Sequence, residues 1–93
     1  MTKPVEFHQL VQEWLKTEFS LSKITHESYS DFQIIFWKGF AVIRIEYNNE
    51  LEVYDYGCVI QSDPVYQAHD PELFNKIKFS VEHRLRRINV MSL

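Results

Sequence analysis

At 93 residues the chain is the size of one globular domain, and we take residues 1–93 as a single domain. Hydrophobic residues make up 45% of it, with only two glycines and three prolines, which excludes disordered and fibrous classes. A formal net charge of −3 disfavours non-specific binding to nucleic acid or anionic lipid. Cys58 is the single cysteine, so no intramolecular disulfide can form. No signal peptide or membrane-spanning run is visible, so we expect a cytoplasmic protein that has no membrane contact and no cofactor.

The first predicted element is a helix over residues 4–19. Pro4 suits the first helical position, and Glu6 falls in the first turn, where negative charge is favoured. Apolar residues recur at three- and four-residue steps and predict one buried stripe: Phe7, Leu10, Val11, Trp14, Leu15 and Phe19. The polar stretch that follows has room for a short edge strand at residues 24–27.

Three segments are rich in β-branched and aromatic residues and predict strands: residues 31–37, 40–46 and 50–56. Lys38-Gly39 predicts a two-residue turn that sets Trp37 opposite Phe40 and continues the pairing outward without a break. In that register one face of the sheet is wholly apolar: Phe32, Ile34, Phe36, Ala41, Ile43 and Ile45.

The next connection is predicted to be a three-residue loop at residues 47–49. A two-residue loop would set Ile45 opposite Glu52 and mix apolar and charged residues on one face. Three residues instead set Ile45 opposite Leu51 and Arg44 opposite Glu52, which keeps the faces distinct.

Gly57 is expected to form a bulge or bend, after which residues 58–60 continue the third strand. Residues 62–70 read as a loop. Asp70-Pro71-Glu72 then marks the start of a second helix, with Asp as cap and Pro at the first position. Apolar residues at helical spacing extend this helix to about residue 89: Leu73, Phe74, Ile77, Val81, Leu85 and Ile88.

Two amphipathic helices need an apolar surface, and the clean sheet face supplies one. The predicted fold is therefore α+β in the order α-β-β-β-α, with both helices packed on one face of an antiparallel meander. The meander has three strands, or four where residues 24–27 add an edge strand.

This order resembles that of double-stranded RNA-binding domains. In that family a glycine-containing loop and a lysine pair that opens the second helix contact the RNA phosphates. Here that place holds Asp70-Pro-Glu-Leu-Phe-Asn, which is acidic, so no residue of the family's motif carries over.

The second face of the predicted sheet is the strongest candidate site. It is expected to collect apolar and aromatic residues: Ile35, Trp37, Phe40, Val42, Tyr54 and Tyr56. Only Gln33, Arg44 and Glu52 interrupt them. If this face is open to solvent, it predicts an interaction surface for a protein partner or a second copy in a homodimer. The alternative is that a loop at residues 62–69, or an early edge segment, covers this face and buries it.

Half of the chain's ten basic residues lie in the second predicted helix and are candidate phosphate contacts: Lys76, Lys78, Arg84, Arg86 and Arg87. The alternative is a solvated outer face, with cations placed favourably near a helix C-terminus.

Residues able to do catalytic or metal chemistry are dispersed: His8, His26, His69, His83, Asp55 and Asp63. None of the histidines has a His or Cys partner four residues away, so no metal site is predicted. Cys58 is expected to be a buried apolar residue, and no nucleophile elbow or glycine-rich phosphate loop is present. No catalytic residue is therefore assigned.

These observations predict a small non-catalytic protein-interaction module, such as a regulator, inhibitor or accessory subunit, that acts through the aromatic sheet face. Small acidic proteins of this kind also occur in phage and mobile elements. Two alternatives stay open: a nucleic-acid-binding domain that uses the basic second helix, and a minimal hydrolase that uses the scattered carboxylates and histidines.

Overall fold

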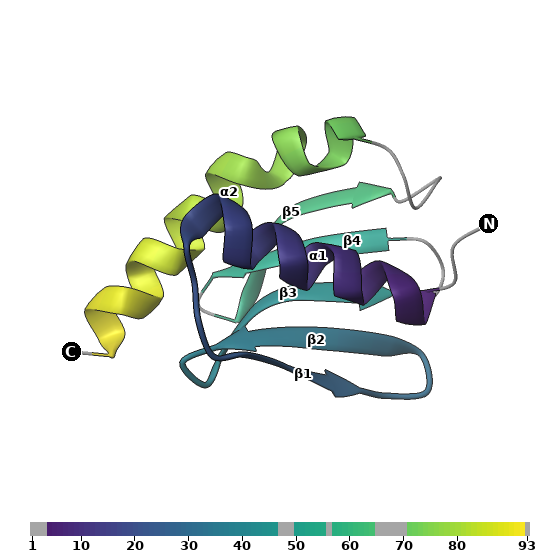
Figure 1. Ribbon diagram of the computed structural model, residues 1–93, viewed down its shortest axis with the longest axis horizontal. Helices are drawn as coiled ribbons and strands as arrows, with labels where there is room; N and C mark the ends of the chain where they lie inside the picture. The colour runs from purple at the N-terminus through teal and green to yellow at the C-terminus, as the bar shows by residue number, and fades with distance from the viewer. Residues whose placement is uncertain (1–3, 47–49, 56, 65–70, 93) are drawn as a thin grey trace.

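A computed structural model describes residues 4–46, 50–55, 57–64 and 71–92. The elements follow one another as α1 (Pro4–Phe19), β1 (Ile24–Ser28), β2 (Phe32–Trp37), β3 (Phe40–Glu46), β4 (Glu50–Asp55), β5 (Cys58–Pro64) and α2 (Pro71–Met91). The strands form one antiparallel sheet in sequential order, and both helices lie against the same face of it (Figure 1). The predicted α+β class and the placement of both helices are confirmed, while the sheet has five strands. Within the described residues, neither helix is long and apolar enough to cross a membrane.

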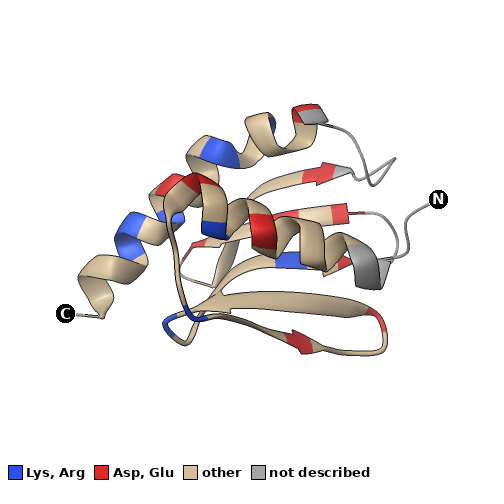
Figure 2. Cartoon of the chain, viewed as in Figure 1, with Lys and Arg blue, Asp and Glu red and all other residues tan. Residues whose placement is uncertain are grey.

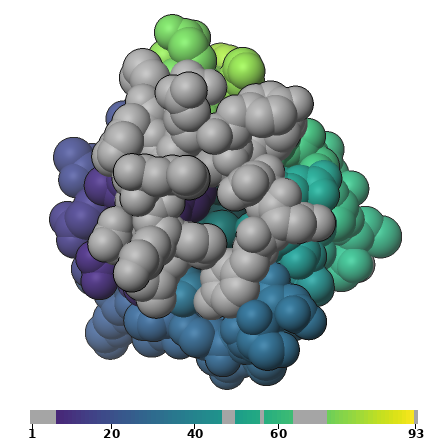
Figure 3. Space-filling view, turned by 90° about the vertical axis from the view of Figure 1, so that its right-hand side faces the viewer, coloured from purple at the N-terminus to yellow at the C-terminus, as the bar shows by residue number. Residues whose placement is uncertain are grey.

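The core lies between the helices and the sheet. A view turned by 90° places α1 on one side of the molecule and β4 and β5 on the other (Figure 3). Buried side chains from both layers form one cluster: Phe7, Val11, Leu15, Ile35, Val42, Ile43, Ile45, Leu51, Val53, Leu73, Ile77, Val81, Leu85 and Ile88. Because each helix contributes residues at three- and four-residue spacing, the amphipathic stripes predicted for both helices account for their packing.

The two helices contact each other through an aromatic pair. The ring of Trp14 in α1 stacks on that of Phe74 in α2, with the centroids 4.8 Å apart, and Lys78 pairs with Glu18 at 2.7 Å. Leu10 is the exception in the predicted stripe of α1, since it is 39% exposed.

The turn between β2 and β3 has the predicted two residues. Lys38 and Gly39 have φ values of 53° and 81°, as in the two-residue turns whose twist matches a hairpin. The Lys38 ammonium lies 4.6 Å from the Trp37 ring centroid and donates to Asn89 Oδ1 at 2.9 Å, which ties the turn to α2.

Beyond this turn a β-bulge changes the register. Trp37 faces Phe40 and Phe36 faces Ala41 as predicted, but Ile35 pairs with Ile43 and the pairing skips Val42. The extra residue lets two consecutive side chains, Val42 and Ile43, both be fully buried.

The bulge turns β2 over relative to the prediction. Ile35 and Gln33 face the helices and are 0% and 1% exposed, whereas Phe32, Ile34 and Phe36 point to the other face. The wholly apolar face predicted for β2 is therefore wrong, and the prediction for Ile43 and Ile45 in β3 is correct. Gln33 donates from Nε2 to Ser28 Oγ at 3.1 Å, while its buried Oε1 has no hydrogen-bond partner among the described residues.

The predicted register of β3 and β4 is confirmed: Ile43 faces Val53, Arg44 faces Glu52 and Ile45 faces Leu51. The connecting loop itself, at residues 47–49, lies outside the described residues. The edge strand expected at residues 24–27 is present as β1.

At Gly57 the chain reverses, so the prediction that residues 58–60 continue the third strand is wrong. Gly57 has a φ of 77°, which glycine adopts without steric cost, and Asp55 then pairs with Cys58. The resulting β5 also includes residues 62–64, which the sequence placed in a loop. Residues 65–70, with the Asp70 cap and the question of whether this segment covers a sheet face, lie outside the described residues. Because the sheet has five strands and not three, the order of elements differs from the α-β-β-β-α order of double-stranded RNA-binding domains.

Candidate interaction surface on the open face of the sheet

The sheet face turned away from α1 and α2 is called here the open face. Strand register assigns these side chains to it: Glu27, Phe32, Ile34, Phe36, Arg44, Glu46, Glu50, Glu52, Tyr54 and Ser62. One row of five crosses the whole sheet from β1 to β5: Glu27, Ile34, Arg44, Glu52 and Ser62. Since both described helices pack on the opposite face, neither of them covers this row.

The structure corrects the predicted interaction set. Ile35 and Val42 are 0% exposed and belong to the core, because the bulge places both on the helix side. Trp37 and Phe40 are partly buried and pack against that core. Tyr54 is on the open face as predicted, and Tyr56 lies outside the described residues.

Sequence reasoning missed three residues of the open face: Phe32, Ile34 and Phe36. The only available signal was the run of four apolar residues Phe40-Ala41-Val42-Ile43, in which a bulge would bury two neighbours at once. Nothing in the run marks where the bulge falls.

Phe32 is the centre of an aromatic group on this face. Tyr29 stacks on it with ring centroids 4.6 Å apart, and the Arg44 guanidinium carbon lies 3.7 Å from its ring centroid. The Tyr29 hydroxyl donates to Glu27 Oε2 at 2.6 Å. Phe32 is therefore held between an aromatic ring and a cation, an arrangement that uses the negative face of the ring.

Arg44 connects the aromatic group to a group of carboxylates. Its Nε lies 2.5 Å from Glu46 Oε1. Burial alone would lower the pKa of Arg44, but Glu46 and Tyr54 together raise it above its ordinary value. Glu46 stands directly opposite Glu50 in the β3–β4 ladder. Arg44 therefore compensates one of two carboxylates that face each other.

The two carboxylates of β4 on the open face, Glu50 and Glu52, accept hydrogen bonds from hydroxyl groups. Ser62 donates to Glu50, and the Tyr54 hydroxyl donates to Glu52 Oε2 at 3.3 Å. Burial raises the pKa of Tyr54, and the neighbouring Glu52 charge raises it further, so the phenol stays protonated at neutral pH.

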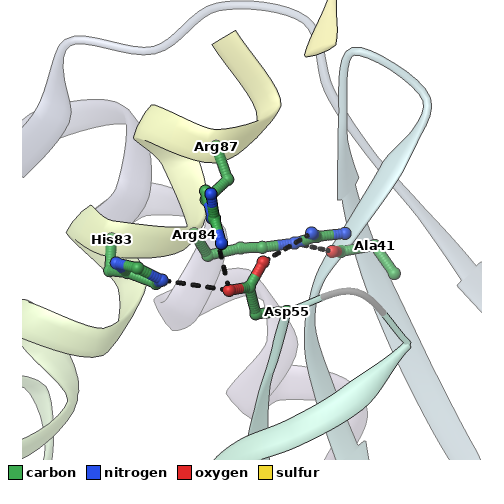
Figure 4. Close-up of polar contacts among 5 residues, drawn as sticks. All are labelled: Ala41, Asp55, His83, Arg84 and Arg87. Atoms are coloured by element: carbon green, nitrogen blue, oxygen red, sulfur yellow. Dashed lines mark hydrogen bonds and ion pairs between the residues drawn. The ribbon is translucent and has the colours of Figure 1, made fainter. Parts of the chain in front are cut away.

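A second polar cluster lies on the opposite face, at the end of β4 (Figure 4). The Asp55 carboxylate accepts hydrogen bonds from His83 Nε2 at 3.0 Å and from Arg84 Nη1 at 3.4 Å. It also forms an ion pair with Arg87, whose Nε lies 3.6 Å away. Arg84 also donates from Nε to the Ala41 carbonyl oxygen at 2.8 Å. Burial alone would raise the pKa of Asp55, but the hydrogen bond from His83 and the charges of Arg87 and Arg84 hold it below its ordinary value. This cluster joins β4 to α2.

The structure also separates the candidate phosphate contacts of α2. Figure 2 shows the basic residues distributed along the helix. Arg84 is 5% exposed and bonded to Asp55 and Ala41, so its proposed phosphate contact is contradicted. Lys78 pairs with Glu18, Arg86 with Glu82 and Arg87 with Asp55, while Lys76 is exposed.

Two of the dispersed histidines meet between α1 and β1. The rings of His8 and His26 lie 4.5 Å apart, and Gln12 Nε2 lies 2.7 Å from His8 Nδ1. Burial, and then the neighbouring His26, lower the pKa of His8. In the part of the chain that is described, no three His, Cys, Asp or Glu side chains are grouped so that they could hold a metal ion. Cys58 is exposed, contrary to the prediction.

No protein-family model matches the chain, and comparisons with curated proteins and with solved structures find no significant match. The chemistry of the surfaces is therefore the basis for inferring function.

Proposed function

We propose that the protein is a non-catalytic protein-binding module that acts through the open face of its sheet. The observation that carries this proposal is the aromatic and aliphatic group formed by Phe32, Ile34, Phe36 and Tyr54 on the face that neither described helix covers. Each of these side chains is partly exposed. Contiguous apolar patches on a protein surface are characteristic of interaction sites, and aromatic residues dominate interface energetics.

The charges near this group favour protein over nucleic acid as the ligand. The open face carries Glu27, Glu46, Glu50 and Glu52, which would repel phosphates. Among the basic residues of α2, Arg84 is buried and three others are paired with carboxylates. A nucleic-acid-binding function therefore has less support than a protein-binding one.

The Asp55 cluster supports a structural role rather than a hydrolytic one. A carboxylate that accepts from His83 could orient that ring as a general base, but Asp55 is also bonded to Arg84 and Arg87. The pairing of Asp55 with the cations of α2 therefore accounts for the buried position of its carboxylate without a catalytic role.

The test compares affinity-tagged wild type with the Phe36→Ala/Tyr54→Ala double variant and with Phe79→Ala. Phe79 is 77% exposed on α2 and serves as an aromatic control away from the open face. We expect a partner protein to be retained by wild type and by Phe79→Ala but not by the double variant. The purified partner should then bind wild type again, as measured by calorimetry. Equal retention by all three folded proteins would contradict the proposal.

Self-association is a second candidate, favoured by the edge strand β5. Val59 and Ile60 on this strand are 46% and 41% exposed, and residues 58–62 contain no charged side chain. Natural edge strands usually carry charges that prevent pairing, as Glu27 does for β1. We expect a β5–β5 dimer to appear by light scattering at high concentration and to disappear in Ile60→Lys; a wild-type monomer throughout would exclude it.

A further inference from the structure

We infer that the open face binds a cationic, extended protein segment and that its basic side chains pair with Glu50 and Glu52. This inference rests on the proposed function and names the chemistry of the partner. Four features of the open face carry this inference: its net charge, the opposed carboxylates of Glu46 and Glu50, the spacing of Glu50 and Glu52 along β4, and the adjacent aromatic rings.

The net charge of the protein is concentrated on this face. Among its described residues are four carboxylates and one guanidinium: Glu27, Glu46, Glu50, Glu52 and Arg44. The whole chain has a formal charge of −3, which is the excess that these five residues provide. The remaining charges of the chain therefore balance, and the open face is the part that attracts cations.

Two of these carboxylates face each other on neighbouring strands, and the described ion pair compensates one of them, Glu46. Glu46 and Glu50 are directly opposite on neighbouring strands, and like charges in such a pair repel. Arg44 pairs with Glu46, while the described partners of Glu50 and Glu52 are the neutral hydroxyls of Ser62 and Tyr54. A bound cation would relieve the repulsion and add ion pairs to the hydrogen bonds that Ser62 and Tyr54 donate.

The spacing of the two carboxylates matches an extended segment. Glu50 and Glu52 are two positions apart in β4 and point to the same face, so their Cα atoms are about 7 Å apart. Basic residues two positions apart in an extended partner have the same separation. A helical partner would match this separation only with basic residues three or four positions apart, so alternation of basic residues is the pattern specific to an extended partner.

The adjacent rings favour arginine over lysine. Arg44 already lies over the Phe32 ring, which shows that this face accommodates a stacked guanidinium. Tyr54 presents a second partly exposed ring next to Glu52. Guanidinium groups stack on aromatic rings and bond carboxylates with two parallel hydrogen bonds, which an ammonium cannot do.

A second copy of the chain is a poorer occupant of this face. Two open faces would bring together eight carboxylates and two guanidinium groups from the described residues, and like-charge contacts oppose such pairing. The partner is therefore a different, basic protein.

The probe is an acetylated and amidated octapeptide that alternates arginine with valine, titrated into ¹⁵N-labelled protein and followed by amide shifts. A peptide with glutamine at each arginine position is the neutral comparison. Protein variants are Glu50→Gln/Glu52→Gln and, as a control of equal charge change, Glu13→Gln/Glu18→Gln, both exposed positions on α1, which packs on the opposite face of the sheet.

We expect the arginine peptide to shift amides of β3 and β4, and its Kd to rise about tenfold in Glu50→Gln/Glu52→Gln but less than twofold in the control. The Kd should also rise when salt increases from about 50 to about 300 mM. Equal binding of the glutamine peptide at β3 and β4 would overturn the cationic partner and keep the protein-binding face. Shifts elsewhere, or none for the arginine peptide, would overturn the inference; the loss of a partner in Phe36→Ala/Tyr54→Ala would then still support the proposed function.

Discussion

Replacing Asp55 with alanine removes the carboxylate that joins β4 to α2 and leaves the Arg84 guanidinium buried without its ionic partner. The Asp55 and Arg84 side chains are 8% and 6% exposed, so water cannot solvate the remaining charge. We expect Asp55→Ala to be strongly destabilising, and the contacts in Figure 4 allow its magnitude to be worked out.

Removing one partner of a buried ion pair costs about 3–5 kcal/mol, mostly because the other charge is left unpaired. Arg84 keeps its hydrogen bond to the Ala41 carbonyl, which favours the lower half of that range. His83 and Arg87 are 54% and 44% exposed at their side chains, so each contributes about 1 kcal/mol or less. Together these terms predict a loss of about 3–4 kcal/mol.

Urea unfolding followed by circular dichroism measures this loss. With a slope of about 1–1.5 kcal/mol/M for a domain of this size, the midpoint should fall by about 2–4 M. Asp31→Ala, at an exposed position, is the control and should change stability by about 0.5 kcal/mol or less. Asp55→Leu/Arg84→Met, which removes both charges, should recover most of the stability.

The effect should depend on pH in one direction. The folded state holds the pKa of Asp55 below the 3.8 of an ordinary aspartate, so the carboxylate stabilises the fold above that pH. This contribution is lost as the pH falls through the lower folded pKa, and the difference between wild type and variant should shrink as the pH falls below 3.8. An Asp55→Ala protein within about 1 kcal/mol of wild type at pH 7 would refute the buried ion pair.

The remaining predictions concern the β2 register and the histidine pair. Ile35→Ala should cost about 2–5 kcal/mol because Ile35 is fully buried, whereas Ile34→Ala, on the open face, should cost less than half as much; equal losses in urea unfolding would mean that the bulge is misplaced. The pKa of His8 is lowered from 6.5, so the folded state binds fewer protons and stability should fall as the pH drops through 6.5. His8→Gln should show a smaller decrease in Tm between pH 7.5 and about pH 5.5, and an unchanged decrease would assign the effect to other groups.

The elements with a strong internal period were predictable. α1 begins and ends at the predicted residues, and α2 begins where Pro71 and Glu72 indicated, because a helix that buries one stripe needs apolar residues at three- and four-residue steps. The β3–β4 register was also predictable, since a slip by one residue would have placed Glu52 among Ile45 and Val53 in the core.

The open face was only partly predictable, and β2 shows why. Its residues 34–37 are apolar at every position, so alternation cannot distinguish its two faces. Gln33, the polar residue that appeared to mark the outer face, is instead buried beside Ser28. Tyr54, Arg44 and Glu52 were placed on that face correctly because β3 and β4 alternate clearly.

By itself, the sequence determined that two amphipathic helices each pack their apolar side against a sheet. It also determined that the chain is mildly acidic. The tertiary structure decided the bulge at Val42, the reversal at Gly57 that creates β5, and the burial of Asp55 among cations of α2. The physical reason is the range of the interactions. Helical periodicity and turn chemistry act between near neighbours, whereas the choice of face for β2 depends on which arrangement buries Ile35, Val42 and Ile43 together beneath the helices.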